Sequence, residues 1–128
     1  MVRVQYPARV ESLVRKREHW AEKNRRAQKQ RSEAHSMLLT KGRAPEHARY
    51  LLTFTRIAPP QAGRLDPDDN LPRAFKHILD GACDWLGIDD GDQRVKAVYR
   101  QEVGNWGCRI EIEERTRCHE CGHELEEA

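Results

Sequence analysis

The residues best suited to chemistry in this chain are carboxylates, gathered in two short clusters. Asp66, Asp68 and Asp69 fall within four positions, and Asp89 and Asp90 follow further along the chain. Carboxylates this close repel one another, which raises their pKa values unless a cation is present. Mg²⁺ binds a few carboxylates and leaves its other positions to water and phosphate. The clusters therefore predict a Mg²⁺ site, with Mn²⁺ as a substitute, that activates water against a phosphodiester.

A helix must connect the two clusters. Apolar residues recur from Leu71 to Leu86 with the spacing of one buried helix face. Asp69 or Asn70 is expected to cap the start of this helix, and Gly87 to end it. The sequence thus predicts one amphipathic helix with a carboxylate cluster at each end.

The exposed side of this helix carries Lys76, which is placed to reach a phosphate or to stabilise a leaving group. A purely structural interpretation stands beside this one. Asp before a helix is ordinary capping, Asp-Gly-Asp is ordinary turn chemistry, and Lys76 with Asp80 is an ordinary surface pair. Two clusters on one helix, near a basic segment, favour the metal site.

The charges are distributed unevenly, although the formal net charge of the 128 residues is only +2. Positions 15–31 hold eight Arg and Lys against two Glu, whereas positions 111–128 hold seven Glu against two Arg. A basic half indicates a surface that faces nucleic acid; the alternative is a solvated helix. The expected DNA-binding residues are Arg15, Arg17, Lys23, Arg25, Arg26, Lys29 and Arg73.

Trp20 lies inside this basic stretch and has two interpretations. Its indole either stacks on a base or anchors the helix in the core, and anchoring is the expected role.

The periodicities predict an α+β fold with a small mixed sheet, in the order strand, helix, strand, helix, strand, strand. The first helix is expected over 13–39 and the first strand over 2–6. The last two strands, 95–103 and 108–113, are expected to form a hairpin around Gly104–Gly107. A domain over 1–115 is followed by an acidic tail, 116–128.

That tail contains candidate zinc ligands. Cys118 and Cys121 have the spacing of half a zinc knuckle, and His123 or His119 is a third candidate. A closed site needs four ligands, which Cys108 or a second subunit could complete; the alternative is an acidic tail with reduced thiols. Cys83 is expected in the core.

No apolar run reaches membrane-spanning length, and the N-terminus lacks the apolar core of a signal peptide. We therefore expect a cytoplasmic location, where the cysteines stay reduced.

Several segments together resemble a known family. Asp66-x-Asp68-Asp69-Asn70-Leu71, then Lys76 and Asp80, then Gly87-Ile88-Asp89-Asp90, is similar to the RusA family of Holliday junction resolvases, and to its phage and prophage branch above all. Pro7, Arg9, His19-Trp20 before a basic helix, and Leu52–Pro59 also match. The resemblance covers roughly residues 1–115.

This resemblance implies a Mg²⁺-dependent homodimeric endonuclease, encoded by a phage or prophage and acting in a bacterial host, that nicks four-way DNA junctions on two symmetry-related strands. It implies that Asp69 and Asp90 are catalytic metal ligands, with Asp89 beside Asp90. The family's first motif Asp falls on Pro67 here, so Asp66 or Asp68 must supply it. The assisting lysine corresponds to Lys76, or one turn earlier to Arg73.

The predicted function is therefore an endodeoxyribonuclease that resolves Holliday junctions or other branched DNA. The alternative is a non-catalytic DNA-binding module with a zinc-stabilised tail, and a weaker one is a nuclease for another DNA shape.

Overall fold

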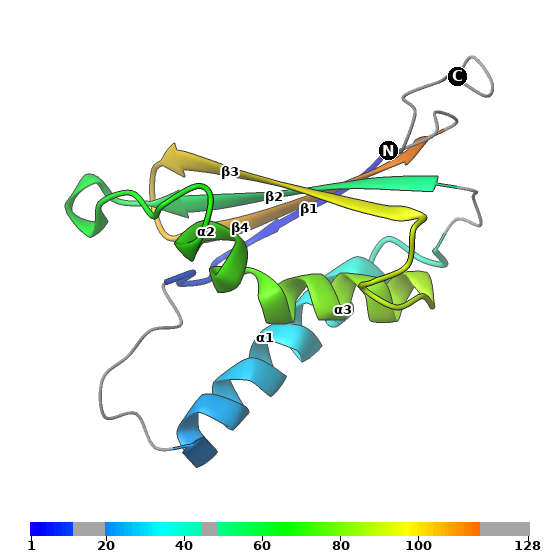
Figure 1. Ribbon diagram of the computed structural model, residues 1–128, viewed down its shortest axis with the longest axis horizontal. Coiled ribbons are helices and arrows are strands. Elements are labelled where there is room, and N and C mark those ends of the chain that lie inside the picture. The colour runs from blue at the N-terminus through cyan, green and yellow to red at the C-terminus, as the bar shows by residue number, and fades with distance from the viewer. Residues whose placement is uncertain (12–19, 45–48, 116–128) are drawn as a thin grey trace.

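The computed structural model describes residues 1–11, 20–44 and 49–115. In this part of the chain, one sheet of four strands carries its helices on a single face (Figure 1). The predicted α+β class with a small mixed sheet is confirmed. The elements are β1 (Val2–Tyr6), α1 (Trp20–Leu39), β2 (Arg49–Ala58), the 3-10 turn η1 (Pro60–Ala62), α2 (Asn70–Ala74), α3 (Lys76–Leu86), β3 (Val95–Val103) and β4 (Gly107–Arg115).

The sheet has the strand order β1-β4-β2-β3. Strand β2 runs parallel to β3 and antiparallel to β4, and β1 is antiparallel to β4. Along the parallel pair Tyr50 lies opposite Val95, and Ala58 lies opposite Val103. A parallel pair needs a crossover connection, and α2 with α3 supplies it. The segment β2-α2-α3-β3 is therefore a βαβ unit.

The predicted hairpin between the last two strands is wrong, because β2 lies between β3 and β4. The connection 104–106 instead crosses the end of β2, where the Gly104 N–H donates to the Ala58 carbonyl at 3.0 Å. Two strand spacings amount to about 10 Å, which a three-residue connection spans easily. A Cβ on Gly104 would lie 2.9 Å from Ile57 Cγ2, so the crossing is close.

The predicted central helix is interrupted at Phe75, whose φ of −98° and ψ of 2° separate α2 from α3. Phe75 is fully buried, and its ring lies 5.4 Å from Phe54 and 5.8 Å from Tyr99. The helix is therefore broken at the residue whose ring packs against the sheet. The predicted helix stop is confirmed, since Gly87 has a φ of 74° in the left-handed region that glycine favours.

Helix α1 contacts the core through a narrow stripe, with Ala34 and Leu38 buried. It packs closely on α3, because a Cβ on Gly81 would lie 2.2 Å from the Arg31 carbonyl oxygen. The expectation that Trp20 anchors the helix is wrong: its side chain is 73% exposed at the start of α1. The predicted helical residues 13–19 lie outside the described residues.

Candidate functional site

The acidic loop 66–69 connects η1 to α2 at the end of the sheet where β2 and β3 terminate. The Asp68 N–H donates to Asp66 Oδ1 at 2.8 Å, and the Leu71 N–H donates to the Asp66 carbonyl at 2.9 Å. Pro67 therefore sits inside a tight Asx-type turn, a place where its fixed φ is favourable. All three carboxylates of the loop are exposed.

The start of α2 is capped differently from the prediction. Asp69 occupies the N-cap position, but its side chain makes no capping hydrogen bond. Its carboxylate pairs instead with Arg73, at 3.0 Å between Oδ1 and Nε. Within the described residues, Asp66 and Asp68 have no ion pair. Arg73 is thus the cation that contacts a predicted metal ligand, whereas Lys76 is exposed at the first residue of α3.

Two side chains fasten this loop to the sheet. Gln101 on β3 accepts a hydrogen bond from the Leu65 N–H at 2.8 Å and donates one to the Leu65 carbonyl at 2.9 Å. Arg56 on β2 donates from Nη1 to the Gly63 carbonyl at 2.9 Å. These contacts immobilise the residues immediately before Asp66. Sequence reasoning missed both side chains, although an arginine within an apolar strand is a signal that could have identified Arg56.

The second acidic cluster lies at the C-terminal end of α3 and in the loop that follows. Asp89 and Asp90 are exposed, and the structure brings them near Asp80 and Asp84. These four carboxylates, after burial itself, raise the pKa of the buried Cys83 thiol to about 12. Cys83 is a core residue, as predicted.

The other carboxylates around this cluster are already paired. Arg31 of α1 donates to both oxygens of Asp84, at 2.6 and 2.8 Å. Arg94 pairs with Asp92 at 2.9 Å, and this hydrogen bonding lowers the Asp92 pKa to about 2. A hollow of about 370 Å³ lies between them, bordered by Asp84, Asp89 and Asp92. It is open and acidic.

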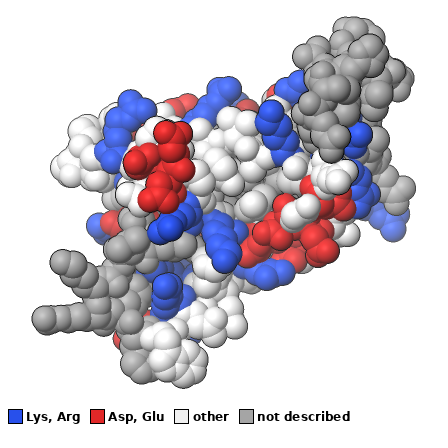
Figure 2. All heavy atoms as spheres, viewed as in Figure 1, with Lys and Arg blue, Asp and Glu red and all other residues white. Residues whose placement is uncertain are grey.

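The two clusters lie at opposite ends of the sheet. The loop 66–69 follows the C-terminal end of β2, whereas Asp89 and Asp90 precede the N-terminal end of β3. Because β2 and β3 are parallel and in register from Tyr50 to Ala58, the ends are about 26 Å apart. Figure 2 shows two separate acidic patches, one over the loop before α2 and one over α3 and the loop after it.

One chain therefore does not bring Asp66, Asp68 and Asp69 together with Asp89 and Asp90. Among the residues that the structure describes, no group of three or more His, Cys, Asp or Glu is arranged to hold a metal ion. Mg²⁺ often uses only one or two carboxylates, with water and phosphate completing its shell. The donor set in the loop 66–69 suits that kind of binding.

The predicted basic surface is exposed along α1. Lys23, Arg25 and Lys29 are exposed and Arg26 is half-buried. A hollow of about 260 Å³ lies between α1 and residues 6–11, and Arg9, Arg26 and Lys29 are among the residues that border it. Glu11 and Glu33 also border this hollow, and Arg9 is paired with Glu11 at 3.1 Å. Arg15 and Arg17 lie outside the described residues.

The predicted zinc ligands Cys118, Cys121 and His123 also lie outside the described residues. Cys108, the suggested fourth ligand, is fully buried and hydrogen-bonded with the Tyr6 side chain. Burial raises the pKa of its thiol to about 12. As a zinc ligand must be a thiolate, this environment disfavours Cys108 in that role.

In residues 1–11, 20–44 and 49–115, we find no helix of the length and apolarity needed to cross a membrane. Comparisons with protein-family models, with curated proteins and with solved structures found no match.

Proposed function

We propose that this chain is a Mg²⁺-dependent endodeoxyribonuclease of RusA type that cuts four-way junctions or other branched DNA. The observation that carries the proposal is the loop 66–69. It presents three exposed carboxylates, held by an internal turn, at the carboxyl end of a parallel βαβ unit. Open sheets with parallel strands commonly bind their ligands at this end.

The charges around the loop support a phosphodiester as the substrate. Arg64 and Arg73 flank it in sequence, and both are exposed. Carboxylates that bind Mg²⁺ and arginines that bind phosphate are both needed where a phosphodiester is cleaved. Asp69, with Asp66 or Asp68, would hold the ion; Arg73 or Lys76 would stabilise the developing charge.

The position of Asp89 and Asp90 bears on the assembly. They precede the opposite end of the parallel strand pair from the loop 66–69 of the same chain, and the two ends of that pair are about 26 Å apart, which is too far to share an ion. A homodimer, as the RusA resemblance implies, would allow the second cluster of one subunit to approach the first cluster of the other. A four-way junction also offers two equivalent strands to two equivalent sites.

The proposal is tested by comparing cutting with binding. The variants Asp69→Asn and Asp90→Asn should lose Mg²⁺-dependent cutting of a synthetic four-way junction while binding it with nearly unchanged affinity. Gel assays of labelled junctions measure both. Junction binding that is insensitive to these substitutions, without cutting by the wild-type protein in Mg²⁺ or Mn²⁺, would instead support a non-catalytic DNA-binding module.

A further inference from the structure

Arg56 is a buried charged residue on a largely apolar strand. Its side chain lies near the C-terminal end of β2 and is only 3% exposed, although arginine is almost never fully buried without a partner of opposite charge. Its Nε donates to the Val10 carbonyl at 2.7 Å, and Nη1 donates to the Gly63 carbonyl at 2.9 Å. Burial lowers its pKa, and the charge of Glu11 acts in the opposite direction. Its hydrogen bonds within the described residues all go to neutral oxygens.

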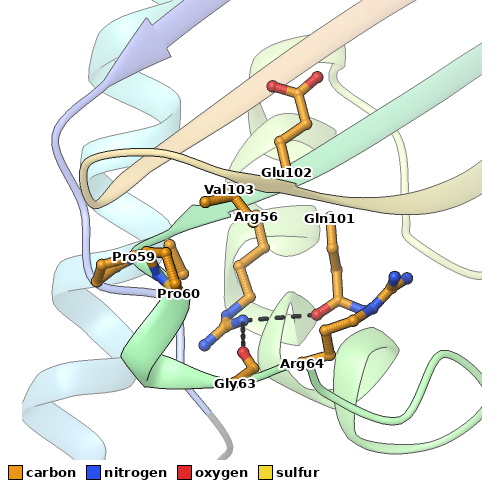
Figure 3. A pocket seen from close by; sticks show the side chains of 9 residues that line it. Arg56, Pro59, Pro60, Gly63, Arg64, Gln101, Glu102 and Val103 are labelled. Carbon is orange, nitrogen blue, oxygen red and sulfur yellow. Dashed lines mark hydrogen bonds between the residues drawn. The ribbon is translucent and has the colours of Figure 1, made fainter.

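The guanidinium borders a pocket of about 100 Å³ between the end of β3 and the loop after β2 (Figure 3). One terminal nitrogen of Arg56 is bonded to Gly63 and more weakly to Gln101, at 3.5 Å; the other points away from both. The carboxylate of Glu102 points away from the pocket and is held by Arg109 at 2.8 Å. Arg56, Gly63, Arg64 and Gln101 are among the residues that line the pocket.

The loop beside the pocket is held in place by hydrogen bonds from Arg56 and Gln101. Gly63 has a φ of 73°, which a side chain would disfavour, and Gln101 fixes the next turn of the loop through Leu65. The guanidinium carbons of Arg56 and Arg9 lie 5.3 and 5.0 Å from the centre of the Trp106 ring. Arg9 is paired with Glu11 at 3.1 Å, whereas the hydrogen bonds of Arg56 go to neutral oxygens.

The size of the pocket limits the anion. Its volume of about 100 Å³ is small beside that of pockets for drug-sized ligands, which suits a single small anion. Nη2 of Arg56 makes no hydrogen bond to any described residue, so its two N–H groups are available to phosphate oxygens. Arg64 at the rim is exposed and has no ion pair with any described residue, so its charge is available.

We propose that this pocket binds one phosphate group, with Arg56 as the buried anchor and Arg64 at the rim. The loop 63–66 leads directly from the pocket to the carboxylates of the acidic loop. The source of the phosphate rests on the proposed function: it is a backbone phosphate of the DNA strand bound at Asp66–Asp69. Free inorganic phosphate is the other source of the same chemistry.

The pocket is tested by titrating inorganic phosphate into the labelled protein while the Nε–H resonance of Arg56 is followed by NMR. We expect a saturable shift that chloride at equal ionic strength does not produce. Arg64→Ala should weaken this binding about fivefold, equivalent to about 1 kcal/mol. The matched control Arg43→Ala, an exposed arginine after α1, should leave the binding unchanged.

Either of two results would overturn the pocket: no saturable shift, or equal phosphate affinity in the wild-type and Arg64→Ala proteins. A folded Arg56→Lys variant should bind phosphate at least tenfold more weakly. Unchanged phosphate affinity in this variant would also contradict the proposed pocket. Arg64→Ala changes only an exposed side chain, so the test does not depend on the folding of the Arg56 variant.

The source of the phosphate is tested with a four-way junction in the absence of divalent metal. The junction should produce the same Arg56 shift and compete with inorganic phosphate. Phosphate binding without competition would assign the pocket to free phosphate and overturn its role on DNA. Junction cutting by a protein that does not bind phosphate would overturn the pocket and leave the nuclease proposal intact. Phosphate binding by a protein that does not cut the junction would overturn the nuclease proposal and leave the phosphate pocket intact.

Discussion

The three carboxylates of the acidic loop differ in the contacts that they already make within the fold. Asp66 uses one oxygen to accept the Asp68 N–H, and its carbonyl accepts the Leu71 N–H. Asp69 is paired with Arg73 in an exposed ion pair, which contributes little to stability. Within the described residues, the Asp68 carboxylate accepts no such hydrogen bond and forms no ion pair. It is therefore the carboxylate that is most available to join Asp69 at a metal ion.

This difference gives a prediction about the first metal ligand. Asp68→Asn should reduce Mg²⁺-dependent junction cutting by about 10²-fold or more, because a charge that stabilises the transition state is lost. Asp66→Asn should reduce it far less, since an asparagine oxygen can still accept the bond that closes the turn. Cutting rates of the two variants at saturating Mg²⁺ decide between them. Equal losses, or a larger loss in Asp66→Asn, would contradict the assignment.

The sequence identified the acidic residues but not the residues that hold them. Their types and spacing are local signals that the sequence displays directly. Arg56 and Gln101 act through contacts between residues far apart in the chain, such as Gln101 with Leu65. No local spacing predicts such contacts. The separation of the two acidic clusters could not be predicted for the same reason, because that separation follows from the register of β2 and β3.

Among the elements, strands and helices with clear periodicity were predictable, whereas their pairing was not. Strand β3 has the predicted bounds, and β4 extends the predicted strand slightly at both ends. The hairpin failed because β2, the most deeply buried strand, takes the position between them. The interruption at Phe75 was also missed, since the spacing of apolar residues continues through it.

The contact between α1 and α3 gives a prediction that opposes helix propensity. Alanine is a better helix former than glycine by about 1 kcal/mol, so Gly81→Ala should stabilise an isolated helix. In this fold the added Cβ would lie 2.2 Å from the Arg31 carbonyl oxygen and 2.9 Å from Ala34 Cβ. We expect a loss of about 1–3 kcal/mol in the free energy of unfolding, measured by denaturant titration.

The matched control for that measurement is Gly91→Ala, where no atom lies within 4 Å of the added Cβ. This variant should change the free energy of unfolding by no more than about 0.5 kcal/mol. A stabilised Gly81→Ala protein would show that the two helices do not approach as closely as described.

The same two helices are joined by the ion pair between Arg31 and Asp84, which gives a pH dependence. The hydrogen bonds from Arg31 hold the pKa of Asp84 below its usual value of 3.8. The pair therefore contributes stability above the usual pKa, and this contribution is lost as the pH falls through the lowered one. As both side chains are partly exposed, the contribution is about 1 kcal/mol or less.

Asp84→Asn should accordingly lower the free energy of unfolding near neutral pH, and the difference from wild type should vanish well below the usual Asp pKa. Denaturant titrations at several pH values measure this, with Arg31→Ala and the double variant completing the cycle. A difference that persists in acid would assign the effect to packing instead of charge.

On the scale of the whole molecule, each end of the sheet carries one acidic cluster. The first lies beside Arg64 and Arg73; the second lies beside Arg31 and Arg94. If both clusters serve one phosphate, as the proposed function requires, they must come from different copies of the chain. A site that uses both clusters therefore depends on how two copies of the chain assemble.

That arrangement predicts rescue between two inactive variants. Asp69→Asn and Asp90→Asn should each fail to cut, yet a heterodimer of the two keeps one intact site. Mixing them in equal amounts with subunit exchange should restore about a quarter of the wild-type sites. The control is a mixture of Asp69→Asn with Asp68→Asn, which share a cluster and should stay inactive. No rescue in verified heterodimers would mean that the two ends act separately.

The most direct measurement of the central claim is cutting of a labelled four-way junction by the purified wild-type chain. The same sequences in a linear duplex serve as the comparison, each with Mg²⁺ and with EDTA. We predict paired nicks in the junction with Mg²⁺, none with EDTA, and far slower cutting of the linear duplex. A protein that binds the junction and leaves it uncut in both Mg²⁺ and Mn²⁺ would contradict the account.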